Sequence, residues 1–277
     1  MVFVQRCAYM TAMNTKNLIQ PTRIPRLFVD APLAAGATAS LGPESTHYLL
    51  RVLRLTTGAT IHVFNGADGL WEASLAGNDR RRHGIEIGQQ IEPQPALKGP
   101  WLAFAVPKRH ALEMIVQKAV ELGVARLIPV ETERAMHDRL NLDRLLRIAV
   151  EAAEQCERLT IPAIVAPLPL AALYESWPAQ RTMFWCDETG GGDPLADAAD
   201  ALLGDENDGG PQPDWGLMIG PEGGFAVSEL DGLSEVPFVK RVTLGPRILR
   251  AETAALAGLA IGQAFVGDGD MPVRGAA

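Results

Sequence analysis

The first part of the chain alternates apolar and polar residues over short stretches that turn signals separate. Alternation with a period of two is typical of strands that bury one face. Asn65-Gly66 and Asp68-Gly69 favour tight turns between such strands. One short helix, expected over residues 44–53, interrupts the series. We therefore predict a small β-barrel over residues 22–93, with strands at residues 26–29, 59–64, 70–75 and 84–88.

From Trp101 onward the pattern changes. Residues 101–106 form a near-continuous apolar run, which is typical of a strand covered on both faces. Residues 110–122 and 142–156 repeat apolar positions with the helical period. Strands that alternate with helices predict an α/β domain with a mostly parallel sheet over residues 101–277. Its further strands are expected at residues 125–130, 181–186, 215–219 and 239–244, and the prolines of residues 94–100 indicate a linker between the two domains.

The length is compatible with this division, because 277 residues suit one large domain or two modest ones. No apolar run approaches the ~18 residues that a membrane span requires, so we expect no membrane partner. Residues 1–21 have few charges and no signal-peptide pattern. We interpret them as a disordered leader or an over-called start, with an amphipathic transit peptide as the alternative.

The cysteines and histidines point to no disulfide or metal. Three cysteines at wide spacing do not form a disulfide framework, which fits a reducing cytoplasm. The five histidines are scattered, and no metal-binding spacing such as HxxxH occurs. We therefore predict a cytoplasmic protein that needs no metal.

The net charge of −8 argues against a protein that coats nucleic acid nonspecifically, because phosphate affinity comes from Lys and Arg. The acidic excess is concentrated in residues 187–214, which hold seven Asp, two Glu and no Lys or Arg. Residues 21–93, in contrast, hold seven Arg against seven Asp plus Glu. A local RNA-binding surface on the barrel is thus compatible with an acidic chain.

Residues 215–225 read as a strand that enters the glycine-rich turn GPEGGF. Glycines allow a ligand to approach the backbone closely, although a plain strand-to-helix turn would use the same residues. The turn is neither a P-loop nor a dinucleotide-binding fingerprint. It leaves open a nucleotide-like ligand that is bound through the backbone in another way.

Residues 242–254 repeat the theme of a strand, a glycine turn and a helix. Glu252 falls in the first helical turn, where a carboxylate complements the helix dipole. Arg247 and Arg250 flank the turn and suggest an anionic partner, although two solvated arginines are the alternative. Ala254, Gly258 and Gly262 then form a stripe of small residues along one helix face, which predicts close packing against a neighbour.

The ordered set of these motifs resembles the ribosomal RNA small subunit methyltransferase E family of the SPOUT superfamily. GPEGGF and LGPRILRAETAA resemble its two C-terminal motifs. The resemblance covers roughly residues 23–266, and residues 1–21, the acidic stretch 205–214 and Cys156-Glu157 depart from it. Its other pieces are PRLFV at 25–29, HYLLRVLR at 47–54, VFNG at 63–66, KAVELG at 118–123, ER at 133–134 and EAAEQ at 151–155 with Arg158.

The resemblance implies a PUA-like barrel, a trefoil-knotted SPOUT domain, a homodimer, and N3-methylation of a uridine in 16S ribosomal RNA with S-adenosylmethionine as the cofactor. Arg250 would stabilise the uracil anion, and Glu252 is a candidate proton acceptor with helix capping as its alternative. The implied cofactor-binding residues are Ile219, Gly220, Glu222, Gly223, Leu244, Gly245, Ile248 and Leu249.

Scattered cations on both domains are candidates for holding the RNA, although each alone could be a surface charge. Arg51 and Arg54 are three residues apart, which predicts that they share a helix face. Two other functions fit the pattern: a SPOUT ribose 2′-O-methyltransferase acting on transfer or ribosomal RNA, and a non-catalytic RNA-binding ribosome assembly factor. The candidate cations are Arg23, Arg26, Arg51, Arg54, Lys108, Arg134 and Arg158.

Overall fold

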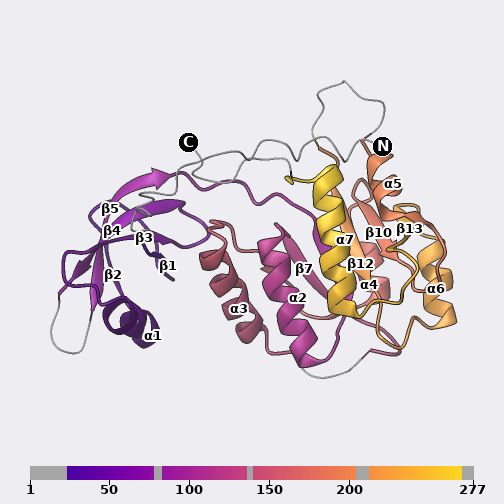
Figure 1. Ribbon diagram of the computed structural model, residues 1–277, viewed down its shortest axis with the longest axis horizontal. Helices are drawn as coiled ribbons and strands as arrows, with labels where there is room; N and C mark the ends of the chain where they lie inside the picture. The colour runs from indigo at the N-terminus through magenta and orange to yellow at the C-terminus, as the bar shows by residue number, and fades with distance from the viewer. Residues whose placement is uncertain (1–23, 78–82, 136–139, 204–211, 270–277) are drawn as a thin grey trace, which may run out of the picture.

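The computed structural model describes residues 24–77, 83–135, 140–203 and 212–269 (Figure 1). The predictions made for residues 1–21, for Arg23 and for most of the acidic stretch 205–214 lie outside these residues. In Figure 1 a small N-terminal sheet lies at one end of the molecule, and a larger sheet with its helices forms the remainder. Within the described ranges, no helix is both long enough and apolar enough to cross a membrane.

The N-terminal sheet has five strands in the order β1-β3-β4-β5-β2. Strands β1 and β3 pair in parallel, and the other pairs are antiparallel. Alternating residues such as Leu27, Ile61 and Ile85 fill its own core, so the expected curled, barrel-like sheet is confirmed. Its strands are β1 (Arg26–Phe28), β2 (Thr38–Ser40), β3 (Thr60–Phe64), β4 (Leu70–Ala76) and β5 (Gly84–Glu92).

The helix expected at residues 44–53 is present in two parts. Helix α1 (Pro43–His47) continues into a π-helical turn over Tyr48–Val52. Arg51 lies in that turn, whereas Arg54 follows it with a positive φ of 56°. The prediction that the two arginines share a helix face is therefore wrong, because the chain has left the helix before Arg54.

The C-terminal sheet is parallel throughout its described pairings, with the order β11-β13-β10-β12-β6-β7-β8 and β9 beside β7. The non-sequential order places β13, β10 and β12 side by side. The mixed α/β fold is as predicted, and the trefoil knot stays a prediction. The strands are β6 (Trp101–Ala105), β7 (Arg126–Glu131), β8 (Ala163–Ile164), β9 (Leu168–Pro169), β10 (Thr182–Cys186), β11 (Asp193–Pro194), β12 (Trp215–Ile219) and β13 (Val239–Thr243).

Helices cover both faces of this sheet, which explains the continuous apolar strands. Leu102 and Phe104 of β6 join one core, while the intervening Ala103 joins the core on the opposite face. The first face is covered by α2 (Arg109–Glu121), α3 (Leu142–Gln155), α5 (Leu195–Asp200) and α7 (Ala251–Val266), and the second by α4 (Leu170–Ser176) and α6 (Val227–Ser234).

The long helices follow the sequence pattern closely. The Asn141 side chain caps α3 by accepting a hydrogen bond of 3.0 Å from the Arg144 amide. The buried stripe of α3 is narrower than expected, because Leu146 and Cys156 are exposed. On α7, Gly258 packs against Leu217, as the small-residue stripe predicts.

Polar contacts join strand β1 of the N-terminal sheet to the larger domain at the end of α3. The Phe28 amide donates to Oε1 of Glu154 over 2.7 Å, and Arg26 donates to the Glu157 carbonyl. Glu157 has a φ of +61°, in the left-handed region that side chains disfavour. The first barrel strand is thus attached directly to the larger domain.

Candidate cofactor and RNA site

Three loops meet where the adjacent strands β10, β12 and β13 end. Parallel strands bring their carboxyl ends to one edge of the sheet, and ligands of open α/β folds bind at that edge. We call it the carboxyl edge, and the opposite one the amino edge. The loops span residues 187–192, 220–226 and 244–250.

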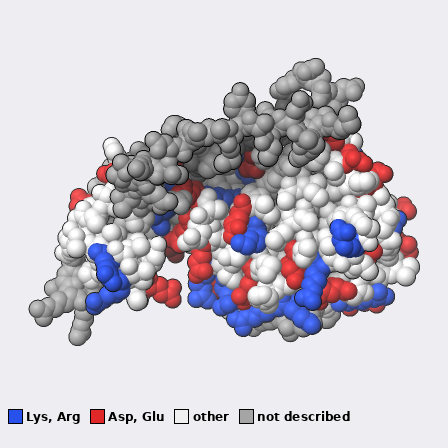
Figure 2. Space-filling view, in the orientation of Figure 1, with Lys and Arg blue, Asp and Glu red and all other residues white. Residues whose placement is uncertain are grey.

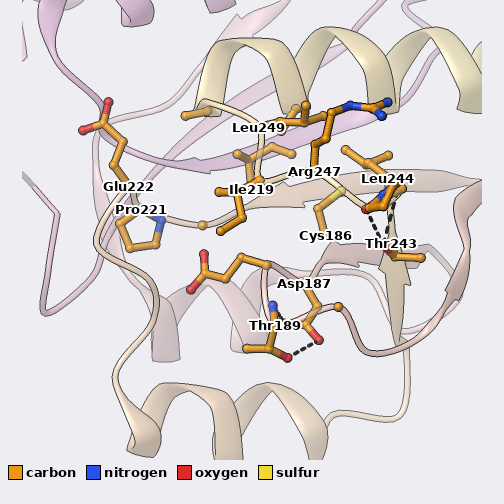
Figure 3. Close-up of a pocket in the computed structure, with 18 residues that line it drawn as sticks. Cys186, Asp187, Thr189, Ile219, Pro221, Glu222, Thr243, Leu244, Arg247 and Leu249 are labelled. Atoms are coloured by element: carbon orange, nitrogen blue, oxygen red, sulfur yellow. Dashed lines mark hydrogen bonds between the residues drawn. The ribbon is translucent and has the colours of Figure 1, made fainter.

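The loops enclose a cavity of about 280 Å³ (Figure 3). Its wall is apolar around Ile219, Leu244 and Leu249, while Glu188 and Glu222 add carboxylates. Burial raises the pKa of the Cys186 thiol to about 12, so this side chain adds an uncharged surface. The cavity therefore offers a ligand an apolar surface, two carboxylates and, from Arg247, a guanidinium. Its remaining lining residues are Asp187, Thr189, Gly190, Gly220, Pro221, Thr243, Gly245, Pro246, Arg247, Ile248, Ala251 and Ala254.

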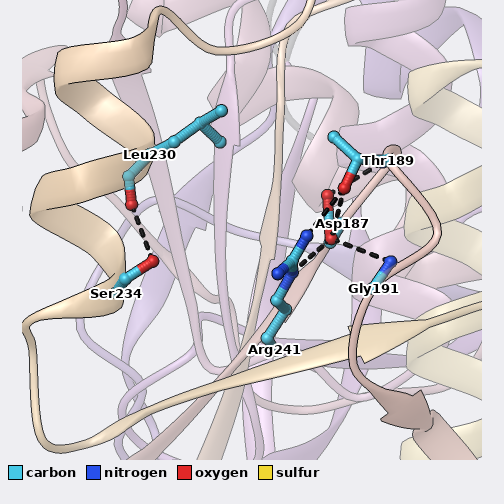
Figure 4. Close-up of polar contacts among 6 residues, drawn as sticks. All are labelled: Asp187, Thr189, Gly191, Leu230, Ser234 and Arg241. Carbon is cyan, nitrogen blue, oxygen red and sulfur yellow. Dashed lines mark hydrogen bonds and ion pairs between the residues drawn. The ribbon is translucent and has the colours of Figure 1, made fainter.

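Asp187 fixes the shape of the first loop (Figure 4). Its carboxylate, only 1% exposed, accepts hydrogen bonds from the Thr189 amide at 2.8 Å and the Gly191 amide at 3.1 Å. Arg241 of β13 donates to the same carboxylate. Burial by itself would raise the pKa of Asp187, but the bonds from Thr189 and Arg241 outweigh it and hold the pKa below its ordinary value. The loop is therefore bonded to the neighbouring strand with Asp187 ionised.

Most of the residues expected to bind a cofactor lie together at this cavity. Ile248 is among them and is 89% exposed, so its side chain has few contacts within the chain. Gly223 does not line the cavity and lies against Arg134 instead. The expected residues that do line it are Ile219, Gly220, Glu222, Leu244, Gly245, Ile248 and Leu249.

The two candidate catalytic residues lie beside the cavity and not in its wall. Arg250 is the exposed residue that precedes α7, and Glu252 lies in the first helical turn. One carboxylate oxygen of Glu252, Oε2, is buried and has no hydrogen-bond partner among the described residues. Arg247, in contrast, lines the cavity directly. No catalytic role is tested by these positions, so both assignments stay predictions.

The sequence interpretation missed the loop after β10. Asp187, Glu188 and Thr189 were counted only as part of an acidic stretch, yet they supply one wall of the cavity. The available signal was the segment DETGGG directly after an apolar strand, which is a third glycine-rich turn. Strand order, which places β10 between β12 and β13, could not be read from the sequence.

Two of the candidate RNA-binding cations make contacts within the chain. Besides its bond to the Glu157 carbonyl, Arg26 lies 3.9 Å from the Glu157 carboxylate. Arg158 donates to the Val120 carbonyl at 3.0 Å and to the Thr160 hydroxyl at 2.7 Å. Burial lowers the pKa of Arg158. These contacts give both arginines a structural role at the domain boundary, and RNA contact by them stays a prediction.

The other described candidates have exposed side chains: Arg51 and Arg54 on the barrel, and Lys108 and Arg134 on the larger domain. Lys108 precedes α2 and Arg134 follows β7, so both belong to the carboxyl edge. Figure 2 shows Lys and Arg gathered along the lower border of the larger domain, interspersed with Asp and Glu. Within the described ranges, no cluster of His, Cys, Asp and Glu is placed to hold a metal ion.

Comparison with known families identifies both parts of the chain. Residues 97–263 match the family described as RNA methyltransferase domain. Residues 41–82 match the RNA methyltransferase PUA domain. The first match lies in the larger domain and the second covers part of the N-terminal sheet.

Individual relatives agree with these matches. A ribosomal RNA small subunit methyltransferase E from Synechocystis sp. is 34% identical over 238 residues, which are 85% of this chain and 76% of that protein. The same-named protein of Rickettsia conorii is 28% identical, over 85% of this chain and 93% of its own. A crystal structure of this enzyme from Neisseria gonorrhoeae bound to S-adenosyl methionine superimposes with a TM-score of 0.73 at 28% identity, covering 89% of this chain and 100% of that one. The family resemblance drawn from the motifs is confirmed.

Proposed function

Because the chain belongs to the ribosomal RNA small subunit methyltransferase E family, we propose that it transfers a methyl group from S-adenosylmethionine to N3 of one uridine in 16S ribosomal RNA. The observation that carries the proposal is the cavity at the carboxyl edge, where both C-terminal motifs meet. The proposed product distinguishes this chain from ribose methyltransferases with a similar knotted domain.

The residues of the cavity fit S-adenosylmethionine. Ile219, Leu244 and Leu249 offer an apolar surface to an adenine ring, and the carboxylates of Glu188 and Glu222 suit a ligand with a sulfonium and an ammonium group. When bound, this cofactor supplies a methyl group that its sulfonium has already activated. The protein then mainly has to align the acceptor and exclude water.

Uridine N3 carries a proton and is a poor nucleophile until that proton leaves. The exposed Arg250 beside the cavity is placed to donate hydrogen bonds to a uracil oxygen that gains negative charge. Glu252, in the first turn of α7, is the candidate acceptor for the proton, because its Oε2 has no hydrogen-bond partner among the described residues. The target base has to leave its stack to reach the cavity.

The barrel of residues 22–93 would serve as the RNA-binding domain, with Arg51 and Arg54 as exposed contacts. Lys108 would extend the contact to the larger domain, next to the cavity. Affinity built from such phosphate contacts falls steeply with salt. RNA affinity that is insensitive to salt would contradict this assignment.

A homodimer acting in the cytoplasm, with a trefoil knot around the cavity, belongs to the same proposal. The highly exposed Ile248 supports a second copy near the cavity, since an apolar side chain so exposed gains by being covered. Sedimentation of the purified protein tests the dimer, and a monomer at micromolar concentration would contradict it.

The decisive test is mass spectrometry of nucleosides from 16S ribosomal RNA, with and without the gene. We expect 3-methyluridine to disappear with the gene and to return when purified protein and S-adenosylmethionine are added to the undermethylated small subunit. Loss of a ribose-methylated nucleoside instead would indicate the other SPOUT reaction. Unchanged nucleosides would indicate a non-catalytic assembly factor.

A further inference from the structure

The turn Gly220–Phe225, called the Gly220 turn below, forms one wall of the cavity with its first three residues. Its last three residues do not line the cavity, and Gly223 and Gly224 lie against Arg134 and Glu188 of two other loops. The Gly224 amide donates to the Pro221 carbonyl at 2.9 Å, which closes the turn on itself. The shape of the cavity wall therefore depends on what holds the second half of the turn.

Arg134 is the first of these contacts. It lies in the loop after β7, and its Nη1 donates to the Gly223 carbonyl over 3.1 Å. A Cβ on Gly223 would lie 3.6 Å from the Cβ of Arg134, so the two backbones are also packed together. The exposed guanidinium thus donates one of its N–H groups to a backbone carbonyl of the turn.

Glu188 is the second contact, from the loop after β10. Burial raises the pKa of its carboxyl, and the nearby Phe225 amide and Arg134 guanidinium oppose that rise. A Cβ on Gly224 would lie 2.3 Å from Oε1 of Glu188 and 3.9 Å from Nη1 of Arg134. The two opposite charges therefore approach the same glycine, whose φ of +71° already favours the absence of a side chain.

Glu229, in the first turn of α6, holds Arg134's own loop in place. Its two carboxylate oxygens accept from the Glu133 amide at 2.9 Å and from the Ala226 amide at 2.8 Å. Because Glu133 precedes Arg134 and Ala226 follows the Gly220 turn, one side chain aligns both partners of the Arg134 bond. An arginine that served only as a solvated RNA ligand would not need this support.

We infer that Arg134 is a positioning residue that holds the Gly220 turn in the conformation that receives S-adenosylmethionine, and that it acts on the cofactor more than on the RNA. The inference rests on the proposed function and revises the earlier expectation that Arg134 binds RNA. The charge of Glu188 and the carbonyl of Gly223 together explain why a cation stands at this position.

The test separates the two roles by measuring both ligands on the full-length protein. Isothermal titration calorimetry gives the Kd for S-adenosylmethionine, and filter binding gives the Kd for the 16S ribosomal RNA fragment. For Arg134→Ala we expect the cofactor Kd and KM to rise about tenfold, the factor for one lost charge-assisted hydrogen bond. At saturating cofactor, kcat and the RNA Kd should stay within about twofold of wild type.

Three further variants keep the result interpretable. Arg134→Lys retains one donor and the charge, so it should recover part of the cofactor affinity. Lys108→Ala, on the same edge, should show the reverse split, with weaker RNA binding and an unchanged cofactor Kd. Lys240→Ala, an exposed cation of β13 with no assigned role, serves as the neutral control, and thermal unfolding checks that every variant is folded.

Weaker RNA binding by Arg134→Ala at an unchanged cofactor Kd would overturn the inference and restore Arg134 as an RNA ligand. Failure of Arg134→Lys to recover any affinity would also contradict it, because the bond to Gly223 needs only one donor. If the wild-type protein itself did not bind S-adenosylmethionine, the proposed function would fall, and the inference with it.

Discussion

The two edges of the large sheet both carry arginines, but they use them in opposite ways. At the amino edge, the guanidinium groups of Arg126 and Arg181 lie over the Trp101 ring, 4.7 and 4.6 Å from its centroid. At the carboxyl edge, Arg247 lines the cavity and Arg250 lies beside it, and both are exposed. The same residue type is therefore part of the packing at one end of a strand and free to meet ligands at the other.

Arg181 illustrates the packed kind. Its side chain is 11% exposed and donates to the carbonyls of Gly99 at 3.3 Å and Trp215 at 2.8 Å, and to the Asp214 carboxylate at 2.9 Å. These contacts join the linker to the starts of two strands. The comparison teaches that the contacts of each arginine, and not its charge alone, separate structural from functional arginines in this fold. Variants at the two edges should therefore affect different measurements.

The largest effect should come from the carboxyl edge, where Arg250→Ala removes the group proposed to stabilise the uracil anion. We expect kcat to fall by about 10²–10³-fold, the range for removing one donor to a developing oxyanion. The cofactor Kd and the thermal midpoint should change little, because Arg250 is exposed. Single-turnover methylation with labelled cofactor measures the effect, and unchanged turnover would remove Arg250 from the mechanism.

At the amino edge, Arg181→Ala should lower the free energy of unfolding by about 3 kcal/mol, because it leaves buried carbonyls without their donor and removes a cation–π contact. Urea denaturation measures the change. Arg181→Lys should restore little, since an ammonium cannot reproduce the planar fork. The contrast between the edges would be broken if folded Arg181→Ala lost turnover instead of stability.

A smaller loss is expected where α7 crosses the start of β12. A Cβ on Gly262 would lie 2.2 Å from the Trp215 ring, so Gly262→Ala forces the helix or the indole to move. Overpacking of this kind costs about 2 kcal/mol, which should lower the thermal midpoint by roughly 5 °C. Ala260→Ser, on the exposed face of the same helix, is the control and should have no comparable effect.

The smallest effect concerns the junction between the domains, also on the amino side. Glu157 has a φ of +61°, which glycine adopts without strain. Glu157→Gly and Glu157→Ala both lose the carboxylate near Arg26, so their difference isolates the backbone term. We expect the glycine variant to be more stable by about 1 kcal/mol in urea unfolding, and equal stabilities would show that the junction tolerates the left-handed conformation at no cost.

The sequence predicted the long, strongly patterned elements well. Trp215–Ile219 is a strand with the expected bounds, and α3 begins at Leu142 as expected. These elements are decided by local periodicity and by burial on both faces. The short helices α4, α5 and α6 were not predicted, because six to eight residues give too few repeats of the helical period.

Only part of the cavity could be predicted, because local sequence patterns reveal some of its walls and not others. The turns at Gly220 and Gly245 carry glycine motifs that can be read locally, and both line the cavity. The wall around Asp187 depends on β10 lying between β12 and β13, which is a long-range pairing. The sequence predicted Arg134 as a surface cation, whereas the structure shows it bonded to the Gly223 carbonyl. That bond joins residues 89 positions apart, so no local pattern encodes it.

The origin of the cavity wall also determines when the cavity can form during synthesis of the chain. Its lining is drawn from residues 186–190, 219–222, 243–249, 251 and 254, so it is complete only after the start of α7 has been synthesised. The barrel can fold much earlier, since domains generally fold as units while synthesis proceeds. A nascent chain stopped before α7 could already contain the folded barrel but would lack part of the cofactor cavity. Retention of such stalled chains on an immobilised cofactor analogue would therefore begin only once α7 has emerged.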